Sequence, residues 1–568
     1  MMGRLLRVFC CLGLASSLVL GQTQPAERVF WIGDLTKSQA WKSVKVGPPL
    51  TELMNTEGES RGVPFGPEGD IVIREGEDTH YLEQFLRLVD PVSWGDQDGV
   101  SIEFFESRMR VRHSPKMLEQ LGQLLDELRR TRTPKLRVQL HLVPRTASVD
   151  AEAGALTKAQ VDRLKSGKVL LAESTLQHGI AGQIRTGRHV AFLGDFDVEV
   201  AQEARIAQPV IRELWDGLLS ELHVGVLSNG DVCVQGRLRL SELTRMRDKD
   251  CEAPWLGRLQ LPTVGFHSIW ASGCFESGGG LLVGASGVDS DHLILISATR
   301  LSPVSHRVGR ALVVPTSLSL APLSFLPQLG KEVSDDDAVL LHADEVQAYI
   351  RHSVPSELWD DSDQTDLHVD RRGLILTSPT ELHAPFLESL KKLEAQNLQT
   401  GALELRYGFL SADASASFSS EGEGPGRVAA ALDGRILTSS IMGTDFQVIA
   451  GSEQLLIHSY QVEIASKSQI ADPQVQPLFS GVWFRGNLSS TGASDVALRG
   501  EFLATDPVQE PVSVDPKCTD VGVVELFNQR KILVHVSGSL TPGSWSVIHA
   551  AKHPGQEGLF VLVAKLRK

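Results

Sequence analysis

The sequence predicts an α+β protein made of two tandem copies of one unit, each a small β-α-β-β-α-β module followed by a β-rich domain. Three observations predict this: one stretch occurs twice, the same order of helices and strands precedes each occurrence, and long turn-rich β segments surround both. The chain of 568 residues is also too long for a single hydrophobic core.

The duplicated stretch is Asp197–Gly217, which recurs as Gln461–Gly481, 264 residues later and without a gap. A fixed spacing without insertions is typical of an internal duplication. The residues common to both are Val198, Glu199, Ala201, Ile206, Ala207, Pro209, Leu214 and Gly217, which recur as Val462, Glu463, Ala465, Ile470, Ala471, Pro473, Leu478 and Gly481.

The first small module is predicted from periodicity and helix signals. Ser114-Pro115 starts a helix, because serine caps and proline fits the first turn. Leu136–Leu142 alternates apolar and polar residues, as a strand with one buried face does. The predicted elements are strand 71–73, helix 80–88, strands 100–104 and 109–111, helix 115–128 and strand 136–142.

The second module repeats this order. Gly373–Pro379 corresponds to Met109–Pro115, and Leu403–Phe409 corresponds to Leu136–Leu142. A strand at 339–341 and a helix at 343–351 come before them, and an apolar stripe from Phe386 to Leu393 indicates the second helix.

The β-rich segments show hairpin signals. Ser228–Asp231 is a predicted turn between two apolar strands, and residues 278–285 and 293–297 predict a later hairpin. Residues 544–548 and 559–563 predict its counterpart in the second copy.

The predicted organisation follows from these elements. It is a signal peptide at 1–21, a flexible lead-in at 22–68, the first module at 69–150, the first β domain at 151–302, a linker at 303–337, the second module at 338–412 and the second β domain at 413–568.

The N-terminus predicts export. Arg4 and Arg7 precede the apolar run Val8–Leu20, and Gly21 is small enough for the residue before a cleavage site. An uncleaved anchor is the alternative. The net charge of −15 disfavours a nucleic-acid-binding protein.

Four cysteines follow the signal peptide: Cys233, Cys251, Cys274 and Cys518. In an exported protein they permit disulfides in three pairings, and free buried thiols are the alternative. Their spacing gives little support for a zinc site.

No motif predicts a catalytic, cofactor or metal site. His549 and His553 have the spacing of helical zinc ligands, but lack the accompanying Glu and fall in a predicted hairpin. Asp360–Asp366 lacks the Gly and Glu of a calcium loop, so a solvated acidic turn is favoured over calcium binding. Gly284–Gly287 lacks one spacer of the hydrolase elbow.

Aromatic and basic residues in the predicted strands also suggest no ligand. Trp215 and Phe479 occupy matched positions of the duplication and are predicted to be core residues. Arg108, Arg110 and His113 are predicted to lie on the solvent face of a strand.

Several segments resemble the secretin family of bacterial type II and III secretion systems. Pro91–Trp94, Met109–Pro115 and Leu118–Leu128 look like the family's small ring-building modules. Val190–Gly217, then Gly280–Ala285 and Leu293–Arg300, look like its β-rich secretin domain. The resemblance covers about residues 70–300 and, less clearly, 338–566. The family's Val-Pro loop signature is absent.

The resemblance implies a non-enzymatic protein of the periplasm or outer membrane of a diderm bacterium. The first hypothesis is a secretin-like envelope protein, an oligomeric outer-membrane channel or secretion component whose modules self-associate through their edges. Other envelope proteins or the outer membrane would be its partners, and nucleic acid would not. The alternative is a non-catalytic periplasmic or surface scaffold or adhesion protein on the same duplicated fold. An exported hydrolase is the third hypothesis.

Overall fold

The computed structural model describes most of the chain from residue 25 to residue 567. The described residues are 25–32, 35, 38–41, 71–74, 80–87, 91–94, 99–105, 108–144, 154–166, 169–200, 205–250, 257–286, 292–301, 307–308, 311–318, 341–359, 365–370, 373–411, 424–465, 468–490, 495–505, 512–514, 524–526, 529–552 and 558–567. The predicted signal peptide at 1–21 lies outside them.

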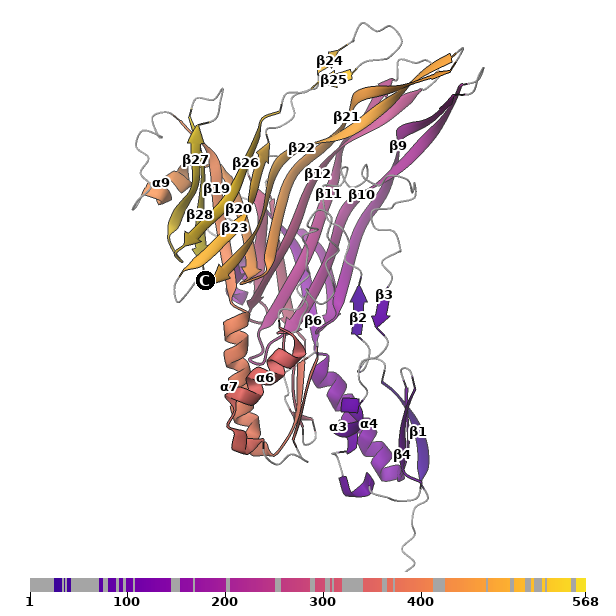
Figure 1. Cartoon of the computed structure of the whole chain (residues 1–568), viewed down its shortest axis with the longest axis vertical. Helices are drawn as coiled ribbons and strands as arrows, with labels where there is room; N and C mark the ends of the chain where they lie inside the picture. Colours follow the sequence, from indigo (N-terminus) through magenta and orange to yellow (C-terminus); the bar gives the residue numbers. More distant parts are fainter. Residues whose placement is uncertain are drawn as a thin grey trace, which may run out of the picture.

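Two large antiparallel sheets dominate the molecule (Figure 1). The first has eight strands in the order β26-β23-β22-β21-β12-β11-β10-β9. Its strands are β9 (Ala181–Val200), β10 (Arg205–Val226), β11 (Val232–Asp250), β12 (Arg258–Phe275), β21 (Asp445–Ala465), β22 (Ser468–Ser490), β23 (Val496–Thr505) and β26 (Lys531–Leu540).

The second large sheet has the order β27-β28-β19-β20-β13-β14-β6-β8, with β7 also paired to β13. Its strands are β6 (Lys135–Pro144), β7 (Gly154–Leu156), β8 (Val169–Gln177), β13 (Gly280–Ser286), β14 (His292–Arg300), β19 (Thr400–Leu410), β20 (Gly434–Ile441), β27 (Trp545–Lys552) and β28 (Leu559–Arg567). The predicted hairpins at 278–297 and 544–563 are confirmed as β13–β14 and β27–β28.

The two large sheets enclose two cores that lie beside each other. Leu136 and Val138 of β6 pack with Leu218 of β10 in one core. Leu403 of β19 packs with Phe446 and Phe484 in the other. The strand predictions for 136–142 and 403–409 are therefore right, but their placement in the small modules is wrong. Their alternating apolar faces are buried in the large sandwich instead.

The first small sheet has the order β1-β5-β4 and carries helices α3 (His80–Arg87) and α4 (Pro115–Arg132) on one face. Its strands are β1 (Ala26–Trp31), β4 (Ser101–Phe105) and β5 (Arg108–His113). As predicted, Ser114 caps α4 by accepting a hydrogen bond from the Met117 amide, and Pro115 occupies the first turn.

This small sheet corrects two predictions. Ala26–Trp31, placed in the flexible lead-in, is a strand paired with β5, because Phe30 and Ile32 are buried in the module's core. The predicted first strand, β3 (Ile71–Arg74), instead pairs with β2 (Ser38–Trp41) in a separate ribbon.

The second small sheet has the order β15-β16-β18-β17 and carries α6 (Ala343–Ser353) and α7 (Thr380–Asn397). Its strands are β15 (Arg307–Val308), β16 (Ala311–Val314), β17 (Asp366–Asp370) and β18 (Gly373–Thr377). The predicted linker at 303–337 thus contributes β15 and β16. Of the strand predicted at 339–341, only Leu341 is described, and it is not in a strand.

The duplicated stretches include the end of the first strand and more than half of the second strand in each of two long hairpins, β9–β10 and β21–β22. Gly187 lies opposite Gly217 in the first hairpin, and Gly451 lies opposite Gly481 in the second. All four glycines have positive φ. A Cβ on Gly217 would lie 2.3 Å from the Thr186 carbonyl oxygen, and the other hairpin is equally tight, so both crossings exclude side chains.

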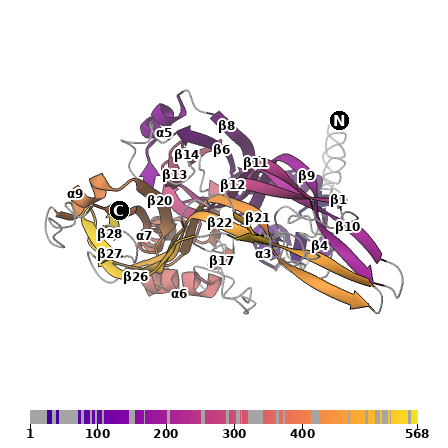
Figure 2. The ribbon, with the colours of Figure 1, turned by 90° about the horizontal axis from the view of Figure 1, so that it is seen from above.

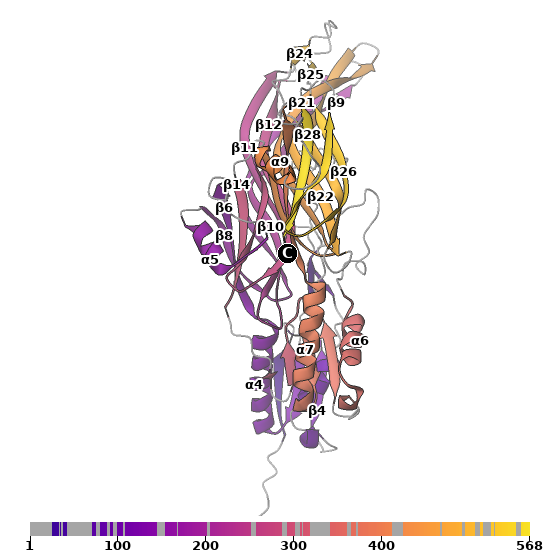
Figure 3. The same ribbon diagram turned by 90° about the vertical axis from the view of Figure 1, so that its left-hand side faces the viewer.

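Each long hairpin also bends at an equivalent bulge. In β9, Gly194 has no residue opposite it in the ladder, because Val210 and Ile211 of β10 pair with the residues on either side of it. In β21, His458 lies in the same way between the paired residues Ile457 and Ser459. Both hairpin tips extend away from the small sheets, which lie at the opposite end of the elongated molecule (Figures 1 and 3). Viewed from above, the two tips lie beside each other (Figure 2).

Candidate assembly interface

The two parts of the chain meet through continuous strand ladders in both large sheets. We call the part from β1 to β14 the first half and the part from β15 to β28 the second half. In the eight-stranded sheet, β12 pairs with β21 from Thr263–Gln454 to Trp270–Gln447. In the other sheet, β13 pairs with β20 through Gly284–Ser286. The halves are therefore joined by backbone hydrogen bonds in both layers.

This internal junction runs head to tail. The last long strand of the first half, β12, pairs with the first long strand of the second half, β21. By order in the hairpins, β12 corresponds to β26, and β21 corresponds to β9. Among the described strands, β26 and β9 are the two edges of this sheet. In this sheet the second half therefore ends on β26, the counterpart of β12. The first half begins with β9, the counterpart of β21, the strand with which β12 pairs.

The other large sheet gives the same direction. Strand β13 of the first half pairs with β20 of the second half, and these strands correspond to β27 and β8. Among the described strands, β27 and β8 are the edges of this sheet. Repeating the internal junction between chains would therefore place β26 and β27 of one chain against β9 and β8 of the next.

Large exposed apolar side chains lie on these edges and on the first small sheet. Val169 and Leu170 lie on β8, and Leu533 on β26 is 60% exposed. Of the other such side chains among the described residues, Val29, Trp31 and Phe105 lie on the first small sheet, and Ile211 and Leu301 lie elsewhere. Apolar side chains on unpaired strands are a liability unless another strand covers them.

A buried carboxylate closes the fork where β12 and β21 separate. Glu525 of β25 (Val524–Leu526), which pairs with β24 (Val512–Val514), accepts hydrogen bonds from Arg247 Nη2 at 3.1 Å and from the Ile457 amide at 3.1 Å. Lys249 Nζ lies 3.9 Å away. Arg247 also donates to the Leu455 carbonyl. Beyond Gln454 these backbone groups have no β12 partner, so the Arg247–Glu525 pair satisfies them across the two halves.

A second buried carboxylate ties α7 to the first half. Glu394 accepts hydrogen bonds from the Ser228 amide, at 3.1 and 3.2 Å, from its hydroxyl, and from Thr316 Oγ1 at 2.7 Å. Burial raises the pKa of Glu394, and the hydrogen bonds from Ser228 and Thr316 oppose that rise. Ser228 belongs to the predicted turn at 228–231, which is confirmed between β10 and β11.

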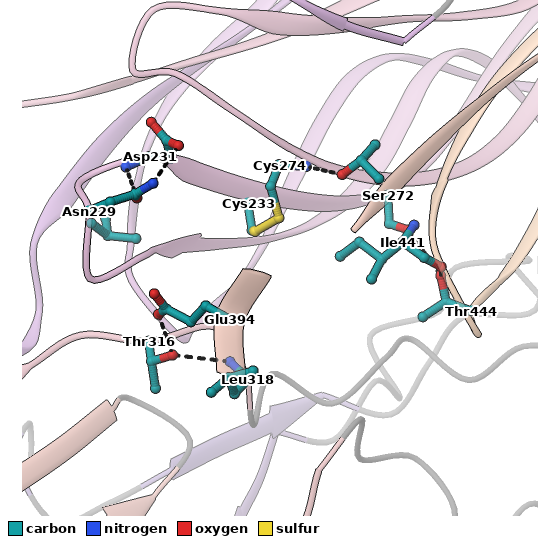
Figure 4. Close-up of a disulfide and its surroundings, with 12 residues drawn as sticks. Asn229, Asp231, Cys233, Ser272, Cys274, Thr316, Leu318, Glu394, Ile441 and Thr444 are labelled. Atoms are coloured by element: carbon teal, nitrogen blue, oxygen red, sulfur yellow. Dashed lines mark hydrogen bonds between the residues drawn. A yellow bond between two sulfur atoms is a disulfide. The ribbon is translucent and has the colours of Figure 1, made fainter. Parts of the chain in front are cut away.

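One of the disulfide bonds that the sequence left open is present. Cys233 on β11 lies directly opposite Cys274 on β12, and the two form a disulfide (Figure 4). The Cys274 amide donates to Thr400 Oγ1 of the second half at 2.9 Å. Cys251 and Cys518 lie outside the described residues. The disulfide thus fixes the strand that forms the junction.

A polar cluster beside the disulfide crosses the junction. Ser272 Oγ on β12 accepts from the Ile441 amide at 2.9 Å and lies 3.1 Å from Thr444 Oγ1 (Figure 4). The disulfide, Glu394 and this cluster lie close together in Figure 4, at the level where the halves join. Sequence reasoning missed Glu394 and Glu525, because neither belongs to a local motif.

The structure brings the other sequence candidates to no common site. His549 lies on β27 near the Phe560 ring, while His553 is outside the described residues. Asp366 begins β17, and 360–364 are outside them. Gly284–Ser286 belongs to β13. In the part of the chain that the structure describes, no group of three or more His, Cys, Asp or Glu side chains is placed to hold a metal ion.

The aromatic and basic candidates differ in how far they are buried. Trp215 and Phe479 are partly buried, the first against the His189 ring and the second against Phe266. Arg108 and Arg110 are exposed, as predicted. His113 is not: it is 4% exposed, and its ring lies 4.7 Å from that of Trp94. The alternation of β5 turns His113 to the same side as Met109 and Val111.

No helix within the described ranges is long and apolar enough to cross a membrane. No family model and no curated protein matches the chain. Solved structures similar to it include secretins. The InvG secretin domain of the Salmonella SPI-1 injectisome has 9% identity and a TM-score of 0.20, covering 50% of this chain and 89% of that one.

Two further secretins align over most of the chain. The ETEC AspS–GspD pilotin–secretin complex has 7% identity and a TM-score of 0.17, covering 86% of this chain and 85% of that one. Aeromonas hydrophila ExeD has 7% identity and a TM-score of 0.18, covering 96% and 90%. These TM-scores are too low to establish a shared fold.

Proposed function

We propose that the protein is a secretin-like, non-catalytic component of a bacterial cell envelope, exported to the periplasm or outer membrane, whose chains associate head to tail. In this role it forms an oligomeric channel or another component of protein secretion. Function then comes from geometry and strand pairing.

The head-to-tail junction between the halves carries the proposal. An interface that joins unlike surfaces leaves one of each surface unused at the two ends of the chain, so it generates rings or filaments when repeated. The edge strands agree in the two large sheets, because one symmetry operation would bring β26 of one chain beside β9 of the next and β27 beside β8. The Cys233–Cys274 disulfide supports export, because disulfides persist in oxidising compartments.

Negative-stain electron microscopy of the mature protein, extracted in detergent from the envelope fraction, tests the proposal. Rings of uniform diameter are the expected result. Single elongated particles, released from the envelope by salt alone, would contradict assembly and favour the alternative of a scaffold or adhesion protein.

The alternative is a periplasmic or surface scaffold or adhesion protein that does not assemble. One observation favours it: both edges of the eight-stranded sheet carry basic side chains, Arg185 and Arg188 on β9 and Lys531 on β26. Lysines and other charges on edge strands commonly prevent edge-to-edge pairing.

A further inference from the structure

The first small sheet exposes a face made of arginines and aromatic side chains. Arg108, Arg110 and Arg112 project from the central strand β5, and all three are exposed. Trp31 of β1 and Phe105 of β4 lie on either side of Arg108 in the ladder. Trp31 is 57% exposed and Phe105 is 37% exposed. An exposed aromatic pair around a cation is unusual on a chain of net charge −15.

Part of this face is already neutralised. Arg110 lies 3.5 Å from Glu27 and 3.3 Å from Glu103, and its guanidinium also lies over the Phe105 ring. Because this face has three arginines and two glutamates, it keeps an excess of positive charge, which lies around Arg108 and Arg112. The face therefore favours a partner segment that brings a carboxylate and small side chains that leave room for Trp31.

The second small sheet shows what covers such a face inside this chain. Its own helices α6 and α7 pack on the side of Leu374 and Leu376. Its other side, with Val313 and Ile375, belongs to one core with Leu121 and Leu125 of α4, and α4 contacts β15 and β16. A helix of the first half thus covers the face of the second sheet that its own helices leave open.

Helix α7 stands in the second half where α4 stands in the first, directly after the last strand of its small sheet. Its solvent-facing residues follow helical spacing: Glu381, Ala384, Glu388, Lys391, Lys392 and Ala395. Glu388 lies 3.0 Å from Lys392. Glu381 and Ala384 form the N-terminal end of this solvent-facing strip, and Lys391 and Ala395 form its C-terminal end, so only the N-terminal end is acidic.

We propose that the exposed face of the first small sheet binds helix α7 of a second copy of this chain. This inference rests on the proposed head-to-tail assembly and names its second contact. Continuity with the internal junction supports it, because the second half of one chain would meet the first half of the next in the small sheets as in the large ones. The exposed face of the first small sheet carries arginines, whereas the covered face of the second small sheet carries Val313 and Ile375. A face that is open to solvent in free chains is expected to be the more polar of the two.

Charge reversal tests the proposal in the purified mature chain. Arg108→Glu should weaken self-association about tenfold, measured as the dissociation constant by sedimentation equilibrium, because it places a carboxylate against Glu381 at the acidic N-terminal end of α7. Adding Glu381→Arg to this variant should restore most of the loss. Arg245→Glu makes the same charge change at an exposed residue of the inner strand β11 and should change the constant less than twofold.

The outcomes separate this inference from the proposed function. If Arg108→Glu and Trp31→Ala leave the constant unchanged while Leu533→Asp on β26 dissociates the chains, the small-sheet contact is wrong and the strand-pairing assembly stands. If the unaltered chain is monomeric at every concentration, both are wrong. Circular dichroism of each variant checks that it folds, which is expected because the altered side chains are exposed.

Discussion

At the residue scale, buried polar groups hold the junction, and their chemistry is invisible in the local sequence. Glu394 and Glu525 each have partners at least 68 positions away along the chain. Sequence patterns reveal neighbours three or four residues apart on a helix or two apart on a strand. They do not reveal which carboxylate meets which hydroxyl after folding. The disulfide shows the same limit, because the sequence left three pairings open and only the register of β11 and β12 selects one.

Acidification should weaken the fold through His267. Burial, and then the nearby charge of His292, lowers the pKa of His267 to about 4. Because the folded pKa lies below the unfolded value, the neutral ring is favoured in the fold. Its contribution is present above about pH 6.5 and is lost as the pH falls towards 4.

Urea unfolding of the unaltered chain and of His267→Gln, between pH 7 and pH 4, measures this contribution. The free energy of unfolding of the unaltered chain should fall by on the order of 1–3 kcal/mol more than that of the variant. Parallel pH profiles for the two proteins would show that His267 does not contribute.

At the element scale, the sequence identified most elements but misplaced several in the sheets. The helices at 80–88, 115–128 and 343–351 were predictable, since caps and apolar stripes are local. The partners of β6 and β19 were not, because an alternating strand fits a small module as well as a large sandwich. Ala26–Trp31 was missed because the buried Phe30 lies between two exposed apolar residues, Val29 and Trp31, so the stretch shows no apolar–polar alternation.

The glycine crossings of the two long hairpins should be intolerant of any side chain. In Gly481→Ala the new Cβ would lie 2.2 Å from the Ala450 carbonyl oxygen, at φ 146°. We expect a loss of about 3 kcal/mol or more in the free energy of unfolding.

Gly538→Ala on β26 is the matched control. Its nearest neighbour would be Ile548 Cδ1 at 3.7 Å, an ordinary contact, so a change below about 1 kcal/mol is expected. Chemical denaturation measures both. Equal effects in the two variants would refute the close crossing of β21 and β22.

The Arg247–Glu525 pair should act as a clasp between the halves. Glu525→Ala leaves Arg247 partly buried without its carboxylate, and the Ile457 amide without an acceptor. Breaking a buried pair in this way costs about 3–5 kcal/mol. Hydrogen exchange should be faster at Ile457 and unchanged at Val448, which stays within the β12–β21 ladder. Slow exchange at Ile457 in the variant would show that Glu525 does not hold the fork.

At the scale of the whole molecule, one geometric relation underlies the proposed assembly. The chain contains the junction β12–β21, and its outer strands β26 and β9 occupy the corresponding places. The duplication of 197–217 indicated two related parts. It could not indicate that they share both large sheets, because strand order between distant segments is set by side-chain packing over the whole fold. The strand order of the proposed assembly likewise could not be predicted from the sequence.

The most direct test is a disulfide between the two edges in the predicted register. Ser268 pairs with Ile449 at the internal junction. Phe275 and Leu540 are the last residues of β12 and β26 and lie opposite the matched residues Val232 and Val496, so Ser268 corresponds to Leu533. By the glycine crossings, Ile449 corresponds to Arg185. Directly opposite residues lie close enough to form a disulfide.

The mature Arg185→Cys/Leu533→Cys protein, oxidised and run on a non-reducing gel, should give a ladder of disulfide-linked multimers that reducing agent removes. Arg245→Cys/Leu533→Cys keeps one cysteine on the edge and moves the other to an inner strand, and it should stay monomeric. If the first variant also stays monomeric at concentrations where the chains meet, the head-to-tail pairing of β26 with β9 is wrong.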